Sequence, residues 1–343
     1  MRVGAFVLAA QFPGQGAGEA LHRAVRTAEV AEESGLDSVW LAEHHFVPYG
    51  VCPSAVTLAA LLLGRTRRLR VGTAVSVLPN THPVALGEQA ALLHLTSGGR
   101  FTVGVGRGGP WVDLEVFGGG LDAYENSFPE ALDLLRRWLT EPRVGGAGGR
   151  FDFRDVAVVP RPSEALEPDT TSPEVIVACT SPRSVRTAAE RGLPMLLGMH
   201  VGDEEKAAMV ALWQETARAA GHAPSVVAGA GHVSAGVCQL ADRTVDAREA
   251  LFKAMPGWLK QGLDAHVTVD GRHRAMRDPV AYTELLCDLH PVGTPRLAAD
   301  RLAATAERTG ITRFALVTEG SGDLAATEEN LRRLGAEVLP RLG

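Results

Sequence analysis

Short apolar runs alternate with amphipathic helical stretches along nearly the whole chain, and this alternation is the strongest constraint on its fold. Parallel strands need long connections between them, and helices are the usual ones. We interpret eight runs as strands, at about residues 3–8, 38–42, 69–78, 101–105, 174–179, 194–198, 231–241 and 313–318. Eight strand–helix repeats predict an α/β fold, a (β/α)8 TIM barrel, and the alternative is a doubly wound sheet with a helical annex.

Two segments interrupt this alternation, and we expect both to be additions to a single domain spanning residues 1–343. An insertion is expected at about 143–173, where a glycine-rich turn and an extended segment precede a proline-rich stretch. A mobile loop is expected at about 261–290, because residues 263–277 are polar and have no clear period. Just before the insertion, residues 122–139 have the pattern of one long helix.

The composition excludes several classes of partner. A net charge of −6 argues against binding nucleic acid or an anionic membrane surface. The first residues contain too short an apolar run for a signal peptide, and no run reaches the ~20 residues of a membrane helix. Four scattered cysteines, without a C-x-x-C pair, indicate reduced buried thiols rather than disulfides or a zinc site. We therefore expect a cytoplasmic protein.

The run SVWLAEHHF at residues 38–46 places ionisable groups at the carboxyl end of an expected strand, where α/β barrels carry their chemistry. Side chains alternate along a strand, so Glu43 and His45 share one face while His44 points to the other. The two histidines are therefore poorly placed to bind one metal ion, and no metal site is predicted. One of the two histidines is therefore free for acid–base chemistry in a cleft, and the other polar groups of the run would orient it.

The fourth and fifth expected strands end in groups suited to a phosphate. Arg107 lies among the glycines of GVGRGG at 104–109, and arginine binds phosphate through two parallel hydrogen bonds. Thr180, Ser181 and Ser184 lie at the start of an expected helix, where amides and hydroxyls favour an anion. The chain contains no Rossmann fingerprint, Walker A loop, HExxH helix or GxSxG elbow.

Several segments together resemble bacterial luciferases and luciferase-like flavin-dependent monooxygenases. The matching segments are LAEHHF at 41–46, VGTAVSVLP at 71–79, GVGRG at 104–108, AAERGLPM at 188–195 and PVGTP at 291–295. They occur in the family's order and cover nearly the whole chain. The resemblance implies a barrel that binds reduced FMN, forms a flavin C4a-hydroperoxide with O2, and oxidises a small organic substrate.

The resemblance also implies roles for particular residues. His44 corresponds to the family's catalytic imidazole, acting near neutral pH as a general base or acid. Arg107 corresponds to the ligand of the flavin phosphate, and Thr180, Ser181 and Ser184 complete that phosphate site. Ala74 and Val75 correspond to a cis peptide beneath the flavin ring, and Trp111 and Trp258 are candidates for the wall of the substrate site.

The resemblance implies partners as well. Reduced FMN would come from a separate flavin reductase, and the chain would form a homodimer through the helices after the second and third strands. The face formed by Ala55, Leu58, Ala59 and Leu62 is apolar enough for such packing, although packing on the barrel would explain it equally. A role in secondary metabolism, such as antibiotic biosynthesis, is a further expectation.

The sequence also departs from the family in two places. Luciferases can carry a reactive cysteine before the phosphate-binding arginine, where this chain has Gly106, and the expected mobile loop is shorter. Both departures argue against light emission and a long-chain aldehyde substrate. Two rival functions remain open: a deazaflavin-dependent oxidoreductase that transfers hydride on the same barrel, and a non-catalytic flavin-binding relative.

Overall fold

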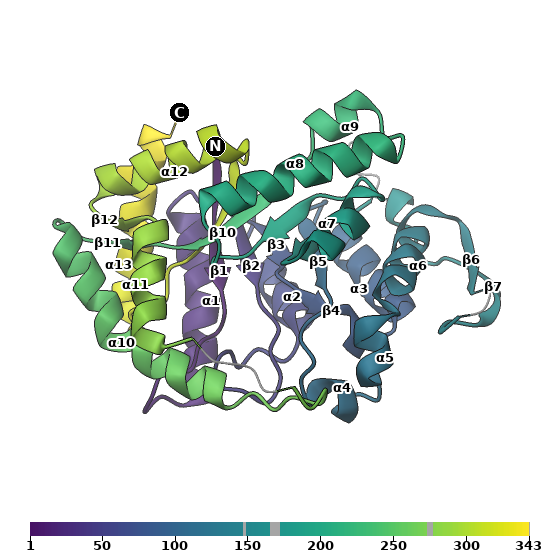
Figure 1. Ribbon diagram of the computed structural model, residues 1–343, viewed down its shortest axis with the longest axis horizontal. Helices are drawn as coiled ribbons and strands as arrows, with labels where there is room; N and C mark the ends of the chain where they lie inside the picture. Colours follow the sequence, from purple (N-terminus) through teal and green to yellow (C-terminus); the bar gives the residue numbers. More distant parts are fainter. Residues whose placement is uncertain (147–148, 165–171, 273–276, 343) are drawn as a thin grey trace.

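The computed structural model describes residues 1–146, 149–164, 172–272 and 277–342. Eight parallel strands in these ranges form a closed barrel: β1 (Arg2–Val7), β2 (Ser38–Leu41), β3 (Arg70–Thr73), β5 (Phe101–Gly106), β8 (Glu174–Cys179), β9 (Met195–Leu197), β10 (Val233–Val237) and β13 (Arg313–Val317). Their order is β3-β2-β1-β13-β10-β9-β8-β5, and pairing of β3 with β5 closes the ring (Figure 1). The predicted TIM barrel is confirmed.

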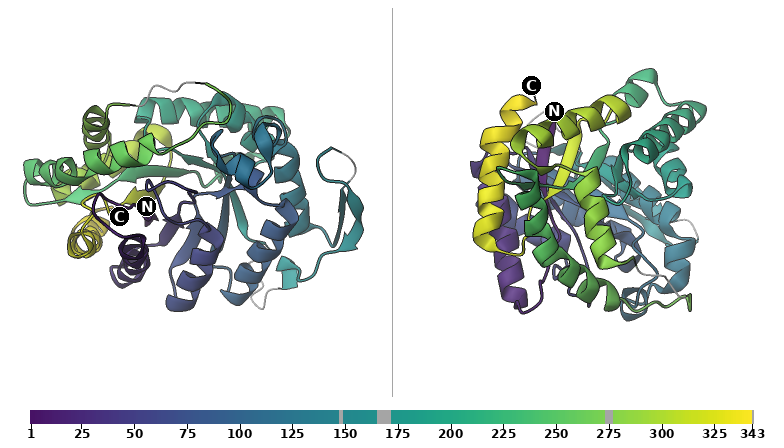
Figure 2. Two further views of the ribbon diagram at one scale, coloured as in Figure 1. Left: turned by 90° about the horizontal axis from the view of Figure 1, so that it is seen from below. Right: turned by 60° about the vertical axis from the view of Figure 1, so that its left-hand side comes forward.

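Helices surround the barrel (Figure 2). The longer ones are α1 (Ala17–Glu33), α2 (Ala55–Arg65), α3 (Pro83–Thr96), α6 (Phe128–Thr140), α7 (Pro182–Ala189), α8 (Asp203–Ala219), α10 (Thr244–Asp264), α11 (Pro279–Leu289), α12 (Pro295–Thr309) and α13 (Leu324–Arg333). Short helices are α4 (Asp113–Val116), α5 (Gly120–Glu125) and α9 (Pro224–Ala228), and β11 (Gln239–Leu240) pairs with β12 (Val292–Gly293). The amphipathic pattern did not predict α11 or α12.

Strand side chains divide between two hydrophobic clusters, as the alternation of a β-strand requires. In β1, Val3, Ala5 and Val7 pack with the inner faces of the surrounding helices. Phe6 belongs to the second cluster, as does Leu8 just beyond the strand, and this cluster fills the barrel interior. Helix α10 contributes Leu251, Met255 and Trp258 to this second cluster.

The strand expected at 69–78 is interrupted. It consists of β3, a short β4 (Ser76–Val77) and a 3-10 turn at Leu78–Asn80. The peptide bond between Ala74 and Val75, which separates β3 from β4, is cis, the geometry that the resemblance implies there. The prediction of one continuous strand was therefore wrong at its carboxyl end.

Two predicted boundaries differ from the structure because a proline marks the start of a helix at each of them, and the prediction did not use this signal. The helix expected at 122–139 is divided into α5 and α6, with Pro129 in the first turn of α6. Proline lacks an amide hydrogen and is tolerated at a helix start, so it separates the two helices. Similarly, Pro279 begins α11, which occupies much of the segment expected as a loop at 261–290. Residues 273–276 of that segment lie outside the described ranges.

The insertion expected at 143–173 contains an antiparallel hairpin of β6 (Arg143–Gly146) and β7 (Phe153–Ala157). The hairpin extends beyond the helices at the right of Figure 1. Residues 147–148, within the expected glycine-rich turn, and 165–171, within the proline-rich stretch, lie outside the described ranges.

The apolar face of α2 packs on the barrel rather than facing a partner. Ala55, Leu58, Ala59 and Leu62 are all buried within the single chain. The exposed apolar side chains of this region are instead Leu61 on α2 and Leu92 on α3. The face proposed for dimer contact is therefore unavailable, because an apolar helix face alone does not reveal whether barrel or partner covers it.

Three expectations from composition can be compared with the described residues. All four cysteines are free and buried, as predicted. Among the described residues, no helix is both long and apolar enough to cross a membrane. The same part of the chain holds no cluster of three or more His, Cys, Asp or Glu side chains that could bind a metal.

Candidate active site

Glu43 joins three elements at the carboxyl end of the barrel. One carboxylate oxygen, Oε1, accepts a hydrogen bond from the amide of Val77 at 3.0 Å, and Oε2 accepts one from Ala55 at 3.2 Å. The segment after β2 is thereby tied to β4 and to the start of α2. His45 Nε2 lies 3.6 Å from Glu43 Oε1, so these two side chains share a face as predicted. Glu43 therefore fixes the position of the segment that carries His44 and His45.

His44 presents one ring nitrogen and hides the other. Its Nδ1 is buried without a hydrogen-bond partner in the described part of the chain. Gly50 lies against that nitrogen, since a Cβ atom at position 50 would come within 2.6 Å of it. Because Nδ1 is enclosed, Nε2 is the nitrogen available to a bound molecule.

Burial also determines the charge of His44. Burial, together with the nearby His266 and His45, lowers the pKa of the imidazole to about 3, and burial is the largest cause. The ring is therefore neutral at physiological pH and can accept a proton or a hydrogen bond. The expectation that His44 acts near neutral pH as a general base or acid stays a prediction, and a neutral ring favours the role of base.

Small residues bring the ends of β2, β3 and β5 together beside His44. The amide of Ala74 donates to the carbonyl of Leu41 at 2.6 Å. The Val75 side chain packs directly over Gly106, where a Cβ atom would lie 2.6 Å from Val75 Cγ2. This contact gives a steric reason for glycine at the position where luciferases can carry cysteine.

Arg107 and two of the predicted hydroxyls line one pocket, of about 40 Å³. Ser181 and Ser184 face this space together with Arg107, because β5 and β8 are neighbours in the barrel. The Arg107 guanidinium lies 4.2 Å from the centroid of the Tyr124 ring. Within the described ranges it makes no hydrogen bond or ion pair, so its donors are available to an anion.

The first turn of α7 forms another side of this pocket. Ser181 caps the helix by accepting a hydrogen bond from the Ser184 amide at 3.3 Å. The Ser184 hydroxyl accepts hydrogen bonds from the amides of Thr180 and Ser181, at 3.2 and 3.1 Å. These amides are the donors that a phosphate oxygen would use at a helix start. Thr180 contributes its amide to this turn, and its side chain is exposed.

Arg183 is a second cation of this pocket that sequence reasoning missed. It lines the same space, and its guanidinium donates to the Glu125 carbonyl at 3.1 Å. The signal was present, because Arg183 lies between Ser181 and Ser184 in the first turn of the helix. Arg107, Arg183 and the hydroxyls therefore form a site whose donors suit a phosphate group.

The two tryptophans lie in different layers. Trp111 lies beside His266, with ring centroids 4.7 Å apart, and its backbone bridges to Thr268. Trp258 is only 1% exposed and lies behind Tyr49, which sequence reasoning did not single out. Trp111 therefore packs against the segment that contains His266 and Thr268, whereas Trp258 packs behind Tyr49.

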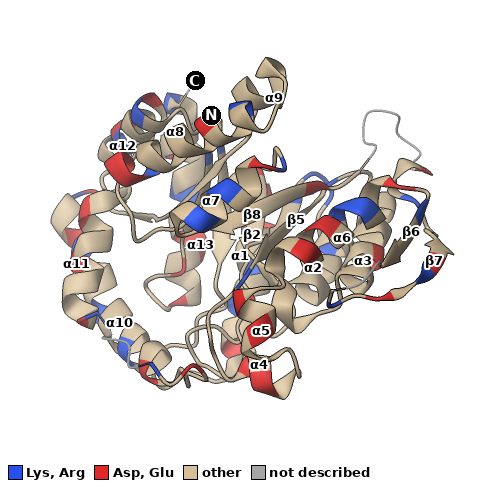
Figure 3. Ribbon diagram, turned by 45° about the vertical axis from the view of Figure 1, so that its right-hand side comes forward, with Lys and Arg blue, Asp and Glu red and all other residues tan. Residues whose placement is uncertain are grey.

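Charged residues are distributed mainly over the helices and loops outside the barrel, and the strands carry few of them (Figure 3). The interior beside His44 is consequently apolar and aromatic. A phosphate site at its edge and an unpaired imidazole nitrogen within it would suit a ligand with an anionic tail and a planar, largely uncharged head.

Comparison with known proteins agrees with this arrangement. The family model of the luciferase-like monooxygenases matches residues 1–313. The alkanal monooxygenase alpha chain of Photorhabdus luminescens is 29% identical over 359 residues, covering 100% of this chain and 98% of that one. The chain therefore belongs to the luciferase-like monooxygenase family, and the resemblance found in the sequence is confirmed.

Solved structures share the fold over the full length of the chain. The monooxygenase RslO1 from Streptomyces bottropensis has a TM-score of 0.83 at 24% identity, and each chain is covered completely. The oxygenating constituent of 3,6-diketocamphane monooxygenase from Pseudomonas putida, solved with FMN, has a TM-score of 0.76 at 21% identity, covering 100% of this chain and 99% of that one. Structures with this fold also include F420-dependent oxidoreductases.

Proposed function

We propose that this protein is the oxygenase component of a two-component monooxygenase, which uses reduced FMN from a separate reductase and O2 to oxidise a small organic substrate. The observation that carries the proposal is the pocket that unites Arg107 with Ser181 and Ser184. A guanidinium without a carboxylate partner, beside a helix start, has the donor set of a phosphate ligand.

The residues of this pocket and of the adjoining barrel mouth fit FMN, whose reduced form would supply the electrons that activate O2. Arg107, Ser181 and Ser184 would hold its phosphate, with the Thr180 amide freed when the Ser184 hydroxyl rotates. Ala74 and Val75 would lie against its ring, because they form the floor between β2 and β5. The packed interior cluster would exclude water from the reacting groups.

His44 would act through Nε2 as a neutral base that holds or removes a proton. A ring without charge suits this role at neutral pH, because it is fully in the accepting form. Trp111 would form part of the substrate wall, and Trp258 would support that wall from behind Tyr49. Because aromatic rings surround His44, we expect a small, largely apolar substrate.

One experiment tests this function against its rivals. The purified protein is titrated with reduced FMN and with reduced F420, and O2 uptake is then followed with each. Tight FMN binding with O2 uptake supports the proposal. Binding of F420 without O2 uptake identifies a hydride-transfer enzyme, a rival kept because F420-dependent oxidoreductases share this fold. FMN binding without any turnover identifies a non-catalytic relative.

We also propose a homodimer, now assigned to the outer faces of α2 and α3. Leu61 is 46% exposed and Leu92 is 54% exposed, and neither has a barrel contact that would bury it. Exposed leucines on neighbouring helices suit the apolar centre of an interface. Sedimentation of the wild type and of Leu61→Asp tests the assignment, and a variant that stays dimeric refutes it.

A further inference from the structure

Tyr49 is the aromatic residue that touches the proposed base. Its ring meets the His44 imidazole edge to face, with centroids 5.1 Å apart and planes at 80°. On its other side it stacks on Trp258, at 4.8 Å and 15°. Tyr49 therefore lies between the imidazole and the packed aromatic core.

The backbone of Tyr49 is held as firmly as its ring. Trp258 Nε1 donates a hydrogen bond to the Tyr49 carbonyl at 3.0 Å. Gly262, one turn further along α10, lies so close that a Cβ atom there would be 2.7 Å from Tyr49 Cα. A residue held from two sides by one helix has little freedom to move away from His44.

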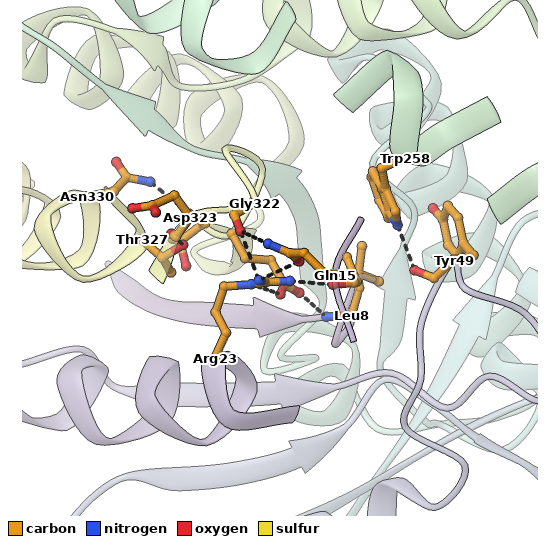
Figure 4. A network of polar contacts seen from close by, with 12 residues as sticks. Leu8, Gln15, Arg23, Tyr49, Trp258, Gly322, Asp323, Thr327 and Asn330 are labelled. Carbon is orange, nitrogen blue, oxygen red and sulfur yellow. Dashed lines mark hydrogen bonds and ion pairs between the residues drawn. The ribbon is translucent and has the colours of Figure 1, made fainter. Parts of the chain in front are cut away.

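The packing behind Tyr49 and Trp258 extends to the buried ion pair of Arg23 and Glu319 (Figure 4). Trp258 contacts Phe12, with ring centroids 5.6 Å apart, and the Arg23 guanidinium lies 5.3 Å from the Phe12 ring. Arg23 in turn binds Glu319 at 3.3 Å, and Glu319 accepts the amide of Leu8 at 2.8 Å. The wall behind Tyr49 is thus fixed to the ends of β1 and β13.

We propose that Tyr49 is a positioning residue for His44, whose ring keeps Nδ1 enclosed against Gly50 and thereby presents Nε2 to the bound ligand. Two observations converge on this role: the unpartnered, buried Nδ1 and the rigid stack that faces the imidazole. Water that entered beside the ring would satisfy Nδ1 and allow the imidazole to turn. The catalytic consequence rests on the proposed function, whereas the effect on the imidazole does not.

The test follows the His44 ring directly by NMR. The full-length protein is labelled with ¹³C and ¹⁵N at histidine, and His44→Gln assigns the His44 signals. Tyr49→Phe keeps the ring and should leave the titration and the tautomer of His44 unchanged. Tyr49→Leu opens space for water and should raise the measured pKa of His44 by about one unit or more, a tenfold change in proton affinity. Phe153→Leu, which removes an aromatic ring from the hairpin, is the matched control and should change neither.

Turnover gives the second measurement. With reduced FMN and a substrate, Tyr49→Leu should lose about tenfold or more in kcat, while its affinity for flavin stays at the wild-type value. Tyr49→Phe should keep the wild-type kcat. A folded Tyr49→Leu with the wild-type titration and tautomer overturns the proposal. If that variant does not fold, Gly262→Ala displaces Tyr49 without removing a ring, and an unchanged His44 in folded Gly262→Ala overturns it as well.

The NMR measurement needs neither flavin nor substrate, so it separates this inference from the proposed function. A shifted His44 in a protein without oxygenase activity supports positioning and refutes the function. An active oxygenase whose His44 ignores Tyr49→Leu supports the function and refutes positioning.

Discussion

The Cα atom of Gly106 lies directly beneath the side chain of Val75, leaving no space for a Cβ atom, which would come within 2.6 Å of Val75 Cγ2. Gly106→Cys should therefore overpack this contact and lower the free energy of unfolding by about 1–3 kcal/mol. Val75→Ala combined with Gly106→Cys should recover most of that loss. Chemical denaturation of the two single variants and the double variant measures the coupling, and strictly additive losses would contradict the steric explanation.

Arg107→Ala should weaken the binding of FMN by roughly 10- to 150-fold, because a charge-assisted hydrogen bond contributes about 1.5–3 kcal/mol. Arg107→Lys should lose less, since it keeps the charge but not the two parallel donors. Arg186→Ala is the matched control, because Arg186 is exposed on the same α7 helix and does not line the pocket. Fluorescence titration with FMN decides, and equal affinities for wild type and Arg107→Ala would refute the phosphate assignment.

His44→Ala should bind FMN normally but lose about 10²–10⁴ in coupled turnover, the usual contribution of a general base. Because the pKa of the His44 imidazole in the protein is lowered to about 3, His44 stays neutral as the pH falls from 8 to 5. Protonation of His44 should therefore not reduce the wild-type kcat/KM over this range. The measurements are kcat/KM of the wild type and the product formed per flavin consumed by each variant, both from pH 5 to 8. Full product yield from His44→Ala would remove the catalytic role.

The stability of the protein should fall as the pH drops below about 6.5, the ordinary pKa of a histidine side chain in water. Burial lowers the pKa of His232 to about 4 and that of His290 to about 3. Their charged forms are thus disfavoured in the folded state, so the unfolded chain binds more protons between these values and about 6.5. A single such group should cost about 2 kcal/mol between pH 7 and pH 5. Urea unfolding at both pH values measures it, and His290→Asn should show a smaller difference than the wild type.

The buried pair Arg23–Glu319 should be sensitive to the loss of one partner. Glu319→Gln leaves the Arg23 charge in the core and should cost about 3–5 kcal/mol of unfolding free energy. Glu328→Gln is the matched control, since Arg26–Glu328 joins the same helix α1 to α13 with Arg26 30% exposed, and should cost about 1 kcal/mol or less. Similar losses in the two variants would show that burial does not set the difference.

The meeting of Arg107 with Ser181 and Ser184 in one pocket could be predicted because barrel topology makes neighbours of residues far apart in sequence. Arg107 ends one strand and Ser181 and Ser184 follow the next barrel strand, so a correct strand count brought them together. The alternation of strands and helices predicted the α/β class, and the family resemblance favoured the barrel over the doubly wound alternative. In contrast, α5 and α6 were joined because Pro129 was not weighed as a helix start.

Other features could not be read from the sequence. The outward and inward faces of α2 are both apolar, so the pattern did not show that Leu58 is buried and Leu61 exposed. Tyr49 lies in a loop without periodicity, and only three-dimensional packing reveals that it touches His44. The charge of His44 likewise depends on how completely its surroundings exclude water, which a motif does not encode.

The segment after α10 is tied to the one after β5 by two backbone hydrogen bonds of 2.9 Å, from the Val112 amide to Val267 and from the Val269 amide to Pro110. Arg107 begins that second segment, only three residues before Pro110. Displacing residues 267–269 would therefore also displace the backbone next to Arg107, the residue proposed to bind a phosphate. Under the proposed function, the segment near the substrate and the segment that binds the coenzyme would therefore be mechanically coupled through these two hydrogen bonds.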